Sequence, residues 1–206
     1  MKAVVQRVLD AAVTVDGVLK GGIAAGLLVY LGVARDDTTR DADWLAEKIP
    51  HLRIFDDKDG KMNLSLLDIV NQQNEAVNEM GVNHENNEVN ITSNILTQRR
   101  GGAKEDAEWA NYAPTSAPLR LRVGSSPHKA PIGVLAVSQF TLLGDARKGR
   151  RPTWDKAAPP EQARELYEYF IEKIRAKVPC ESGEFQTHMH VTYTNDGPVT
   201  ILLDSE

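Results

Sequence analysis

The segment Gly133–Asp145 places the strongest constraint on the fold, because it begins as a run of apolar residues and turns abruptly polar. Val134–Val137 contains no polar position, which is typical of a short strand buried on both faces of its sheet. Leu27–Val33 has the same character. Two strands of this kind require a substantial core around them, so the chain is expected to fold around a central sheet.

Polar residues follow the first of these strands directly. Ser138, Gln139 and Thr141 surround one aromatic residue, Phe140. Buried hydroxyl and amide groups need hydrogen-bond partners, and a bound ligand can supply them. The segment therefore indicates either a pocket at the end of the strand or a strand that leaves the core and enters a turn, and composition does not choose between the two.

Periodicity predicts an α+β domain. Two amphipathic helices are expected over 38–49 and 160–177, capped by Asp37 or Thr38 in the first case and started by proline in the second. About seven short strands accompany them, including those expected at 3–8, 13–15, 18–20, 27–33, 53–55, 134–137 and 185–193.

The middle of the chain differs in composition. Residues 71–94 are rich in asparagine and hold few large apolar side chains, so no regular core element is expected there. We expect one domain over residues 1–206, interrupted at about 70–131 by a polar loop or disordered insertion. Within it, 104–112 has the pattern of a short helix and 119–123 that of a strand.

Composition limits the classes of function. No apolar run approaches the roughly 18 residues of a membrane span, and the first residues contain no signal-peptide pattern. The single cysteine, Cys180, excludes an internal disulfide and a zinc site built on paired cysteines. These features predict a cytoplasmic protein with no membrane association.

A net charge of −5 does not suggest general affinity for nucleic acid. One local cluster of basic residues nevertheless lies just after the polar strand end. It is either a solvated turn or a surface that faces phosphates, and it consists of Arg147, Lys148, Arg150, Arg151 and Lys156.

Motifs for familiar chemistry are missing. His188 and His190 share one strand face, but no carboxylate or thiol at matching spacing supports a metal site, so solvent-facing histidines are expected. The acidic turn 56–60 lacks the ligand positions of a calcium loop. No histidine shares a motif with Ser138 or Thr141, so a Ser-His-Asp hydrolase is not supported, and no metal or cofactor is expected.

Five motifs in order resemble those of the D-aminoacyl-tRNA deacylase family. The resemblance covers residues 1–69 and 132–203, and ordered motifs are far more specific than any single one. They are Ala3–Val8, Arg53–Leu64, Ser138–Leu142 (SQFTL), Gly149–Pro152 (GRRP) and Asn195–Thr200 (NDGPVT).

This resemblance implies a fold with a curved, mixed, barrel-like sheet and two packed helices. It also implies hydrolysis of the ester that joins a D-amino acid, or glycine, to tRNA. Members of the family are homodimers with the active site at the subunit interface, and they proofread chirality in translation by rejecting L-aminoacyl esters. The L-aminoacyl ester is rejected because it would clash with the pocket and leave polar groups without hydrogen-bond partners.

The resemblance also assigns residues. Gly197-Pro198, in a cis peptide, is implied to project into the partner's pocket as the chiral selector, while Asn195, Met189 and Arg7 lie near it. The catalytic segment is implied to be Ser138, Gln139, Phe140 and Thr141, with backbone N–H groups near Phe140 and Thr141 holding the oxyanion.

Thr141 matches a threonine once considered the nucleophile of the family. Because no base is available to activate it, we expect the 2′-hydroxyl of the tRNA to assist instead. Arg147, Lys148, Arg150 and Arg151 are the candidates for tRNA contact. Two alternatives stay open: a tRNA-end binder without catalysis, and an esterase acting on another small acyl substrate.

Overall fold

The computed structural model describes residues 1–79 and 130–205. Contacts divide the chain into two compact units, one formed by 1–75 with 128–206 and the other by 76–127. Of the second unit, only 76–79 are described, as the end of a helix. The helix expected at 104–112 and the strand expected at 119–123 therefore lie outside the described residues.

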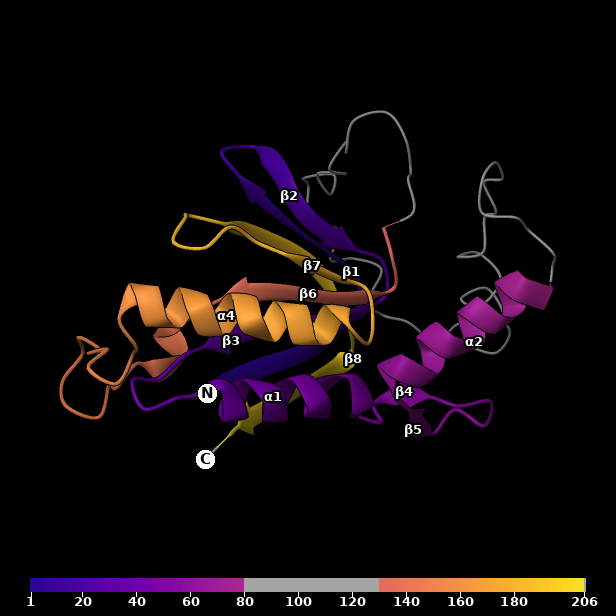
Figure 1. The fold of residues 1–206 in the computed structure, drawn as a ribbon, viewed down its shortest axis with the longest axis horizontal. Coiled ribbons are helices and arrows are strands. Elements are labelled where there is room, and N and C mark those ends of the chain that lie inside the picture. The colour runs from indigo at the N-terminus through magenta and orange to yellow at the C-terminus, as the bar shows by residue number, and fades with distance from the viewer. Residues whose placement is uncertain (80–129, 206) are drawn as a thin grey trace, which may run out of the picture. The chain divides into compact units, whose positions relative to one another are not determined.

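A six-stranded mixed sheet forms the centre of the first unit (Figure 1). Its strand order is β2-β1-β3-β6-β7, and β8 pairs with the free side of β1. The pairs β3–β6 and β6–β7 are parallel, whereas β1 runs antiparallel to β2, β3 and β8. The strands are β1 (Lys2–Val15), β2 (Val18–Ile23), β3 (Gly26–Gly32), β6 (Gly133–Ser138), β7 (Cys180–Ser182) and β8 (His190–Asp204).

The sheet curls until its outer strands β2 and β7 meet. At this meeting point a Cβ atom added to Gly21 would lie only 2.6 Å from the backbone oxygen of Ser182. Glycine is therefore required for so close an approach of two backbones. The expected curved, mixed, nearly closed sheet is confirmed.

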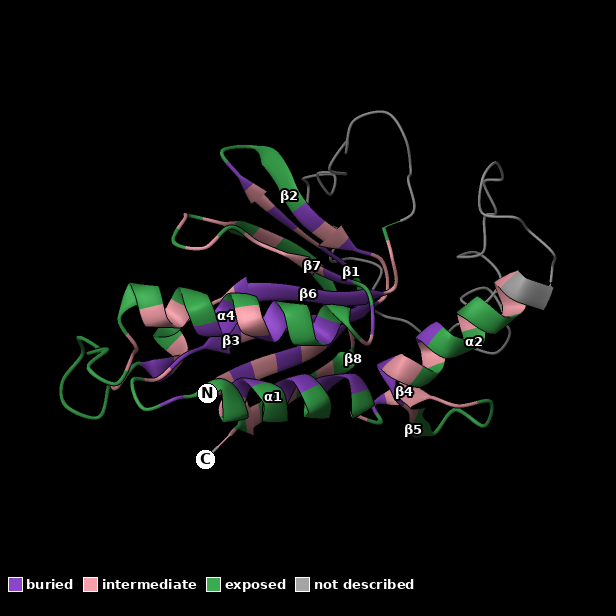
Figure 2. Cartoon of the chain, in the orientation of Figure 1, coloured by how far each residue is buried: buried purple, intermediate pink, exposed green. Residues whose placement is uncertain are grey.

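Two helices, α1 (Thr39–Lys48) and α4 (Pro160–Arg175), lie side by side on the outer face of the sheet (Figure 1). Side chains of β3 alternate between two cores, as strand geometry requires. Leu27 and Leu31 pack in the cluster that includes the helices, whereas Leu28 packs in a second cluster with Leu135. Buried positions accordingly follow both faces of the central strands (Figure 2).

The two expected helices are confirmed. Thr38 caps α1 with a capping box in which Asp41 accepts the backbone N–H of Thr38, at 2.8 Å. Pro50 stands in a short 3-10 turn, Ile49–His51, after that helix. Pro160 begins α4, and the Tyr167 hydroxyl anchors this helix by donating to the Ala136 oxygen at 2.9 Å. Burial raises the pKa of Tyr167, so the hydroxyl stays a donor.

Three strand boundaries differ from expectation. The separate strands expected at 3–8 and 13–15 form one strand, β1, because pairing with β8 continues through bulges. The strand expected at 185–193 begins only at His190, since Gln186 adopts a left-handed φ of 62° in a turn. The strand expected at 53–55 appears as β4 (Phe55–Asp56), paired with β5 (Met62–Leu64).

A third helix, α2 (Leu66–Glu79), was not expected. It corrects the prediction that a polar loop begins at about residue 70. Ser65 and Asp68 form its capping box: the Asp68 carboxylate accepts from the Ser65 N–H at 2.9 Å and from its hydroxyl at 2.7 Å. These bonds, the backbone one first, lower the pKa of Asp68. The sequence carried this start signal, but the polar residues after Val70 obscured it.

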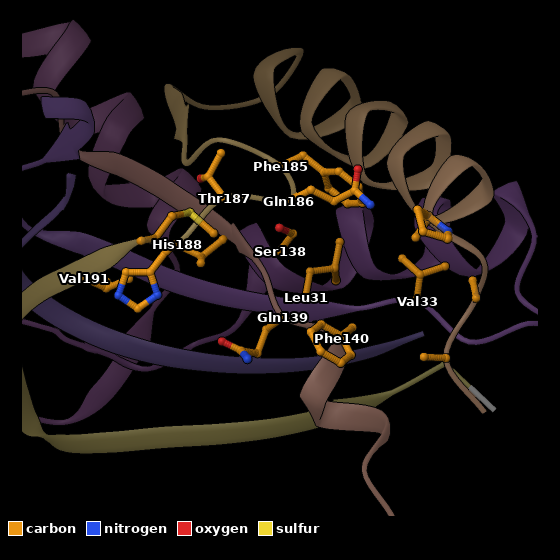
Figure 3. Close-up of a pocket in the computed structure, with 16 residues that line it drawn as sticks. Leu31, Val33, Ser138, Gln139, Phe140, Phe185, Gln186, Thr187, His188 and Val191 are labelled. Carbon is orange, nitrogen blue, oxygen red and sulfur yellow. The ribbon is translucent and has the colours of Figure 1, made fainter. Parts of the chain in front are cut away.

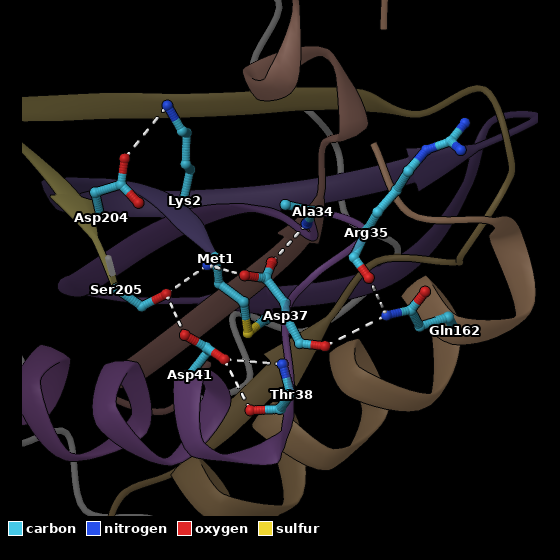
Figure 4. A network of polar contacts seen from close by, with 10 residues as sticks. All are labelled: Met1, Lys2, Ala34, Arg35, Asp37, Thr38, Asp41, Gln162, Asp204 and Ser205. Atoms are coloured by element: carbon cyan, nitrogen blue, oxygen red, sulfur yellow. Dashed lines mark hydrogen bonds and ion pairs between the residues drawn. The ribbon is translucent and has the colours of Figure 1, made fainter. Parts of the chain in front are cut away.

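Polar contacts tie both ends of the described chain to the start of α1 (Figure 4). The α-ammonium of Met1 is buried and pairs with the Asp37 carboxylate at 2.5 Å. It also donates to the Ser205 hydroxyl, which in turn donates to Asp41 at 2.8 Å. These contacts hold the end of β8 beside β1.

None of the described helices is long and apolar enough to cross a membrane.

Candidate active site

A pocket of about 780 Å³ opens where β3 and β6 end (Figure 3). The start of α4 and the connection from β7 to β8 supply its other walls. Its surface is mostly apolar, with several polar side chains among the residues that line it. The lining residues are Leu31, Val33, Val137, Ser138, Gln139, Phe140, Ala157, Ala158, Pro160, Ala163, Phe185, Gln186, Thr187, His188, Met189 and Val191.

The polar strand end predicted from sequence lies at this pocket. The Gln139 N–H donates to the Leu31 oxygen at 2.8 Å, after which the chain enters a 3-10 turn, Phe140–Leu143. The turn packs so tightly against β3 that a Cβ on Gly32 would lie 2.5 Å from Leu143. Ser138, Gln139 and Phe140 are thus held at the pocket by the two neighbouring strands.

Thr141 belongs to the same turn but does not line the pocket. Its hydroxyl accepts a hydrogen bond from the Gln139 side-chain amide. The first N–H groups of a helical turn have no partner inside that turn. The arrangement therefore orients the Gln139 side chain and leaves backbone donors near Phe140 for a ligand.

The wall formed by Phe185–Met189 was largely missed from sequence. Met189 lines the pocket and also packs against the core cluster that contains Leu28 and Leu135. His188 borders the same pocket as Ser138, although the two belong to no common motif. In the described part of the chain, no hydrogen bond joins them. The alternation over 185–193 predicted a strand through this wall and gave no signal of a pocket.

His188 and His190 are both exposed, as expected, with their rings edge to face at 5.1 Å between centroids. Among the residues that the structure describes, no group of three His, Cys, Asp or Glu side chains could hold a metal ion.

The other predicted residues form a second group around Arg7, on β1. The Arg7 side chain is buried, and its Nε lies 3.0 Å from the Asp196 carboxylate on β8. Its Nη1 donates to the Ile54 oxygen at 2.6 Å and lies 3.6 Å from the Asp56 carboxylate. The guanidinium thus joins β8 to the segment before β4.

Gly197-Pro198 stands in β8 beside this guanidinium, exposed to solvent, and its peptide bond is cis. Gly197 has a φ of +128°, and an added Cβ would lie 2.7 Å from the Val199 side chain and 3.2 Å from Arg7. The Asn195 side-chain oxygen accepts from the Val199 N–H at 3.0 Å and closes the loop around the dipeptide. Only glycine fits this position without a shift of its neighbours.

The pocket at Ser138 and the group around Arg7 and Gly197-Pro198 are far apart within one chain. Val191 lines the pocket, and Gly197 lies six residues further along the same strand, which corresponds to about 20 Å at roughly 3.3 Å per residue. Strand register also separates the two groups. Ser138 pairs with Leu31, whereas Arg7 pairs with Leu27, four positions away and one strand further across the sheet.

Four residues of the basic cluster lie in an exposed hairpin, and Lys156 follows it; the four are Arg147, Lys148, Arg150 and Arg151. Asp145 and Thr153 close the hairpin through two backbone hydrogen bonds of 2.8 and 3.0 Å. Within it, the Arg147 side chain bonds both oxygens of the Asp145 carboxylate, and these bonds hold the pKa of Asp145 well below its usual range. Arg147 is thus partly neutralised, while Lys148, Arg150 and Arg151 extend into solvent.

Comparison with known proteins gives consistent results. The chain matches the family model described as D-Tyr-tRNA(Tyr) deacylase over residues 4–76 and 122–204. It is 45% identical over 207 residues to the D-aminoacyl-tRNA deacylase of Koribacter versatilis (strain Ellin345), covering 100% of this chain and 98% of the relative. For the protein of the same name from Kosmotoga olearia (strain ATCC BAA-1733 / DSM 21960 / TBF 19.5.1), identity is 43% over 205 residues, with 100% and 97% covered.

Two solved structures resemble the fold. A structure titled c-Myc DNA Unwinding Element Binding Protein superposes with a TM-score of 0.67 at 30% identity, covering 100% of this chain and 99% of that one. A structure titled as a probable eukaryotic D-amino acid tRNA deacylase superposes with a TM-score of 0.60 at 14% identity, covering 98% and 97%. The second likeness supports the fold alone.

Proposed function

The chain belongs to the D-Tyr-tRNA(Tyr) deacylase family and is a hydrolase of the D-aminoacyl-tRNA ester, and from this premise we propose that its active site is shared between two copies of the chain. The pocket at Ser138 would take the terminal adenosine and the ester. Gly197-Pro198 of the second copy would cover the α-carbon of the amino acid. We place this reaction in the cytoplasm, where charged tRNA is used.

This proposal depends on the distance between the pocket and Gly197-Pro198 of the same chain. A dipeptide about 20 Å along β8 from the pocket cannot reach the ester bound in its own chain. A two-fold homodimer offers each pocket the dipeptide of the partner, because its interface is the same patch on both copies. The exposed, firmly held Gly197-Pro198 suits such a role.

Each residue of this shared site then has a specific role. Ser138 and Gln139 orient the ester, and the N–H groups of Phe140 and Thr141 stabilise the oxyanion that forms when water attacks its carbonyl carbon. Arg7 and Asn195 hold the selector in position, and Met189 supports the pocket wall. Exposed Lys148, Arg150 and Arg151 contact the tRNA backbone, together with Arg147 once Asp145 releases it.

Thr141 serves as a partner for the Gln139 amide rather than as nucleophile, because the described residues place no base against its hydroxyl. The 2′-hydroxyl of the terminal ribose assists the reaction instead. Glycine esters pass the same filter, since glycine has no side chain to be rejected.

The first test compares D-Tyr-tRNA and L-Tyr-tRNA with the purified protein. The D-ester is expected to be hydrolysed at least about a thousandfold faster, a difference of about 4 kcal/mol in the barrier. Thr141→Val is expected to retain most of the D-specific activity. Equal loss of both esters would disprove the chiral filter, and binding without hydrolysis would favour a tRNA-end binder.

A mixing experiment tests the shared site. Gln139→Trp should block the pocket with a bulky ring, and Gly197→Ala should displace the selector, so each variant alone is expected to be inactive. After the two are unfolded and refolded together, half the dimers are mixed, and each mixed dimer has one intact composite site. About a quarter of wild-type activity is then expected.

Refolding each variant separately is the control for this experiment. If both sites were built within single chains, mixing would restore nothing, and the shared-site proposal would have to be abandoned. Size-exclusion chromatography with light scattering checks that each refolded sample is a dimer.

A further inference from the structure

Phe140, which lines the pocket, forms an aromatic pair with Trp154. Phe140 lines the pocket yet is 58% exposed, and Trp154 beside it is 39% exposed. Their ring centroids are 5.7 Å apart with an interplanar angle of 62°. Neither side chain belongs to the two core clusters, so packing of the fold does not explain why they lie there.

Trp154 is held in this place by its neighbours. Its backbone oxygen accepts from the Ala157 N–H at 2.9 Å, which forms a turn before the pocket wall. One edge of its indole lies against Gly144, where an added Cβ would be 3.3 Å from Nε1. The contact with Gly144 thus positions one edge of the Trp154 side chain, while much of the ring faces solvent.

Positive charge lies immediately before this residue in the chain. The hairpin closed by Asp145 and Thr153 carries exposed Lys148, Arg150 and Arg151, and Trp154 follows its last residue. Exposed aromatic rings next to cationic side chains are the combination that binds single-stranded nucleic acid, through base stacking and phosphate contacts. The remainder of the chain is acidic on balance, so the combination is local.

We propose that Trp154 stacks on the base of the nucleotide that precedes the terminal adenosine of tRNA, which is the penultimate cytidine of the 3′ end. This inference rests on the proposed function, because it assumes that the terminal adenosine enters the pocket bordered by Phe140. The next base along the strand then lies at the pocket mouth, where Trp154 is exposed. The basic hairpin receives the phosphates that follow.

Three substrates separate this role from others: D-tyrosyl-adenosine, D-tyrosyl-CpA and D-Tyr-tRNA. Only the last two contain the penultimate base. Trp154→Ala is expected to raise KM about tenfold for both of them, in line with the loss of one stacked base. For D-tyrosyl-adenosine the change should stay within twofold, and Trp154→Phe should restore most of the lost affinity.

Trp44 offers a matched control, since it is 42% exposed and lies on α1. Trp44→Ala should change no KM, and thermal unfolding should show that both alanine variants are folded. A similar rise of KM for all three substrates would overturn the proposal and make Trp154 a support for Phe140. No rise for any would also overturn it. If the wild-type protein hydrolysed none of the three, the proposed function itself would fail.

Discussion

Gly197→Ala is expected to lower kcat/KM for D-Tyr-tRNA about 100-fold or more while the protein stays folded. Gly197 has a φ of +128°, a conformation that L side chains rarely adopt, and its added Cβ would meet Val199 at 2.7 Å and Arg7 at 3.2 Å. The dipeptide must therefore shift. A displacement of about 1 Å in a positioning group can cost about 100-fold in rate. Single-turnover deacylation measures the effect.

Gly60→Ala is the matched control for this substitution. Gly60 also has a positive φ, +76°, but nothing lies within 4 Å of an added Cβ, and the residue stands in the turn between β4 and β5. Its substitution is expected to cost some stability and no activity. If Gly197→Ala behaved in the same way, the selector role of the dipeptide would be disproved.

Arg7→Ala is expected to lower the free energy of unfolding by about 3 kcal/mol and Tm by roughly 10 °C. The guanidinium is buried, and it reaches the Ile54 oxygen at 2.6 Å and the Asp196 carboxylate at 3.0 Å. Removing it leaves the buried carbonyl without this donor and frees the Asp196–Pro198 segment. D-ester hydrolysis should therefore fall together with stability. Thermal unfolding and deacylation are measured on the same sample.

Lys20→Ala is the comparison for that loss. Lys20 and Glu184 form an exposed ion pair at 2.8 Å, and exposed pairs contribute about 1 kcal/mol at most. Arg7→Lys separates charge from geometry, because one ammonium cannot reach both the Ile54 oxygen and the Asp196 carboxylate. If Arg7→Ala were as mild as Lys20→Ala, the buried contacts would contribute nothing to the hold on Gly197-Pro198.

Local patterns predicted much of the fold. The helices α1 and α4 follow from strong apolar periodicity with proline and capping signals at their ends, and β3 and β6 from continuous apolar runs. The same reasoning missed α2. Its start is capped by Ser65 and Asp68, but after Val70 only Ala76 and Val77 are apolar, so the helical pattern is weak there.

The candidate site also has one part that could be predicted from the sequence and one part that could not. Ser138–Thr141 was recognisable because polar residues after a buried strand are an exception to core composition, and those residues do lie at the pocket or in its turn. The wall at Phe185–Met189 was not recognisable as a pocket wall. Its position depends on a left-handed turn at Gln186 and on the path of the chain from β7 to β8.

The sequence by itself determined the class of fold, the buried strands and the motifs that carry the family resemblance, because burial and turn preferences are local properties of residue type and spacing. Only the tertiary structure decided which motifs meet. Strand pairing places Arg7 beside Gly197-Pro198 and keeps that dipeptide about 20 Å along β8 from Val191 at the pocket. The alternation of a strand specifies which face each residue occupies, but which distant segments pair is decided by tertiary packing.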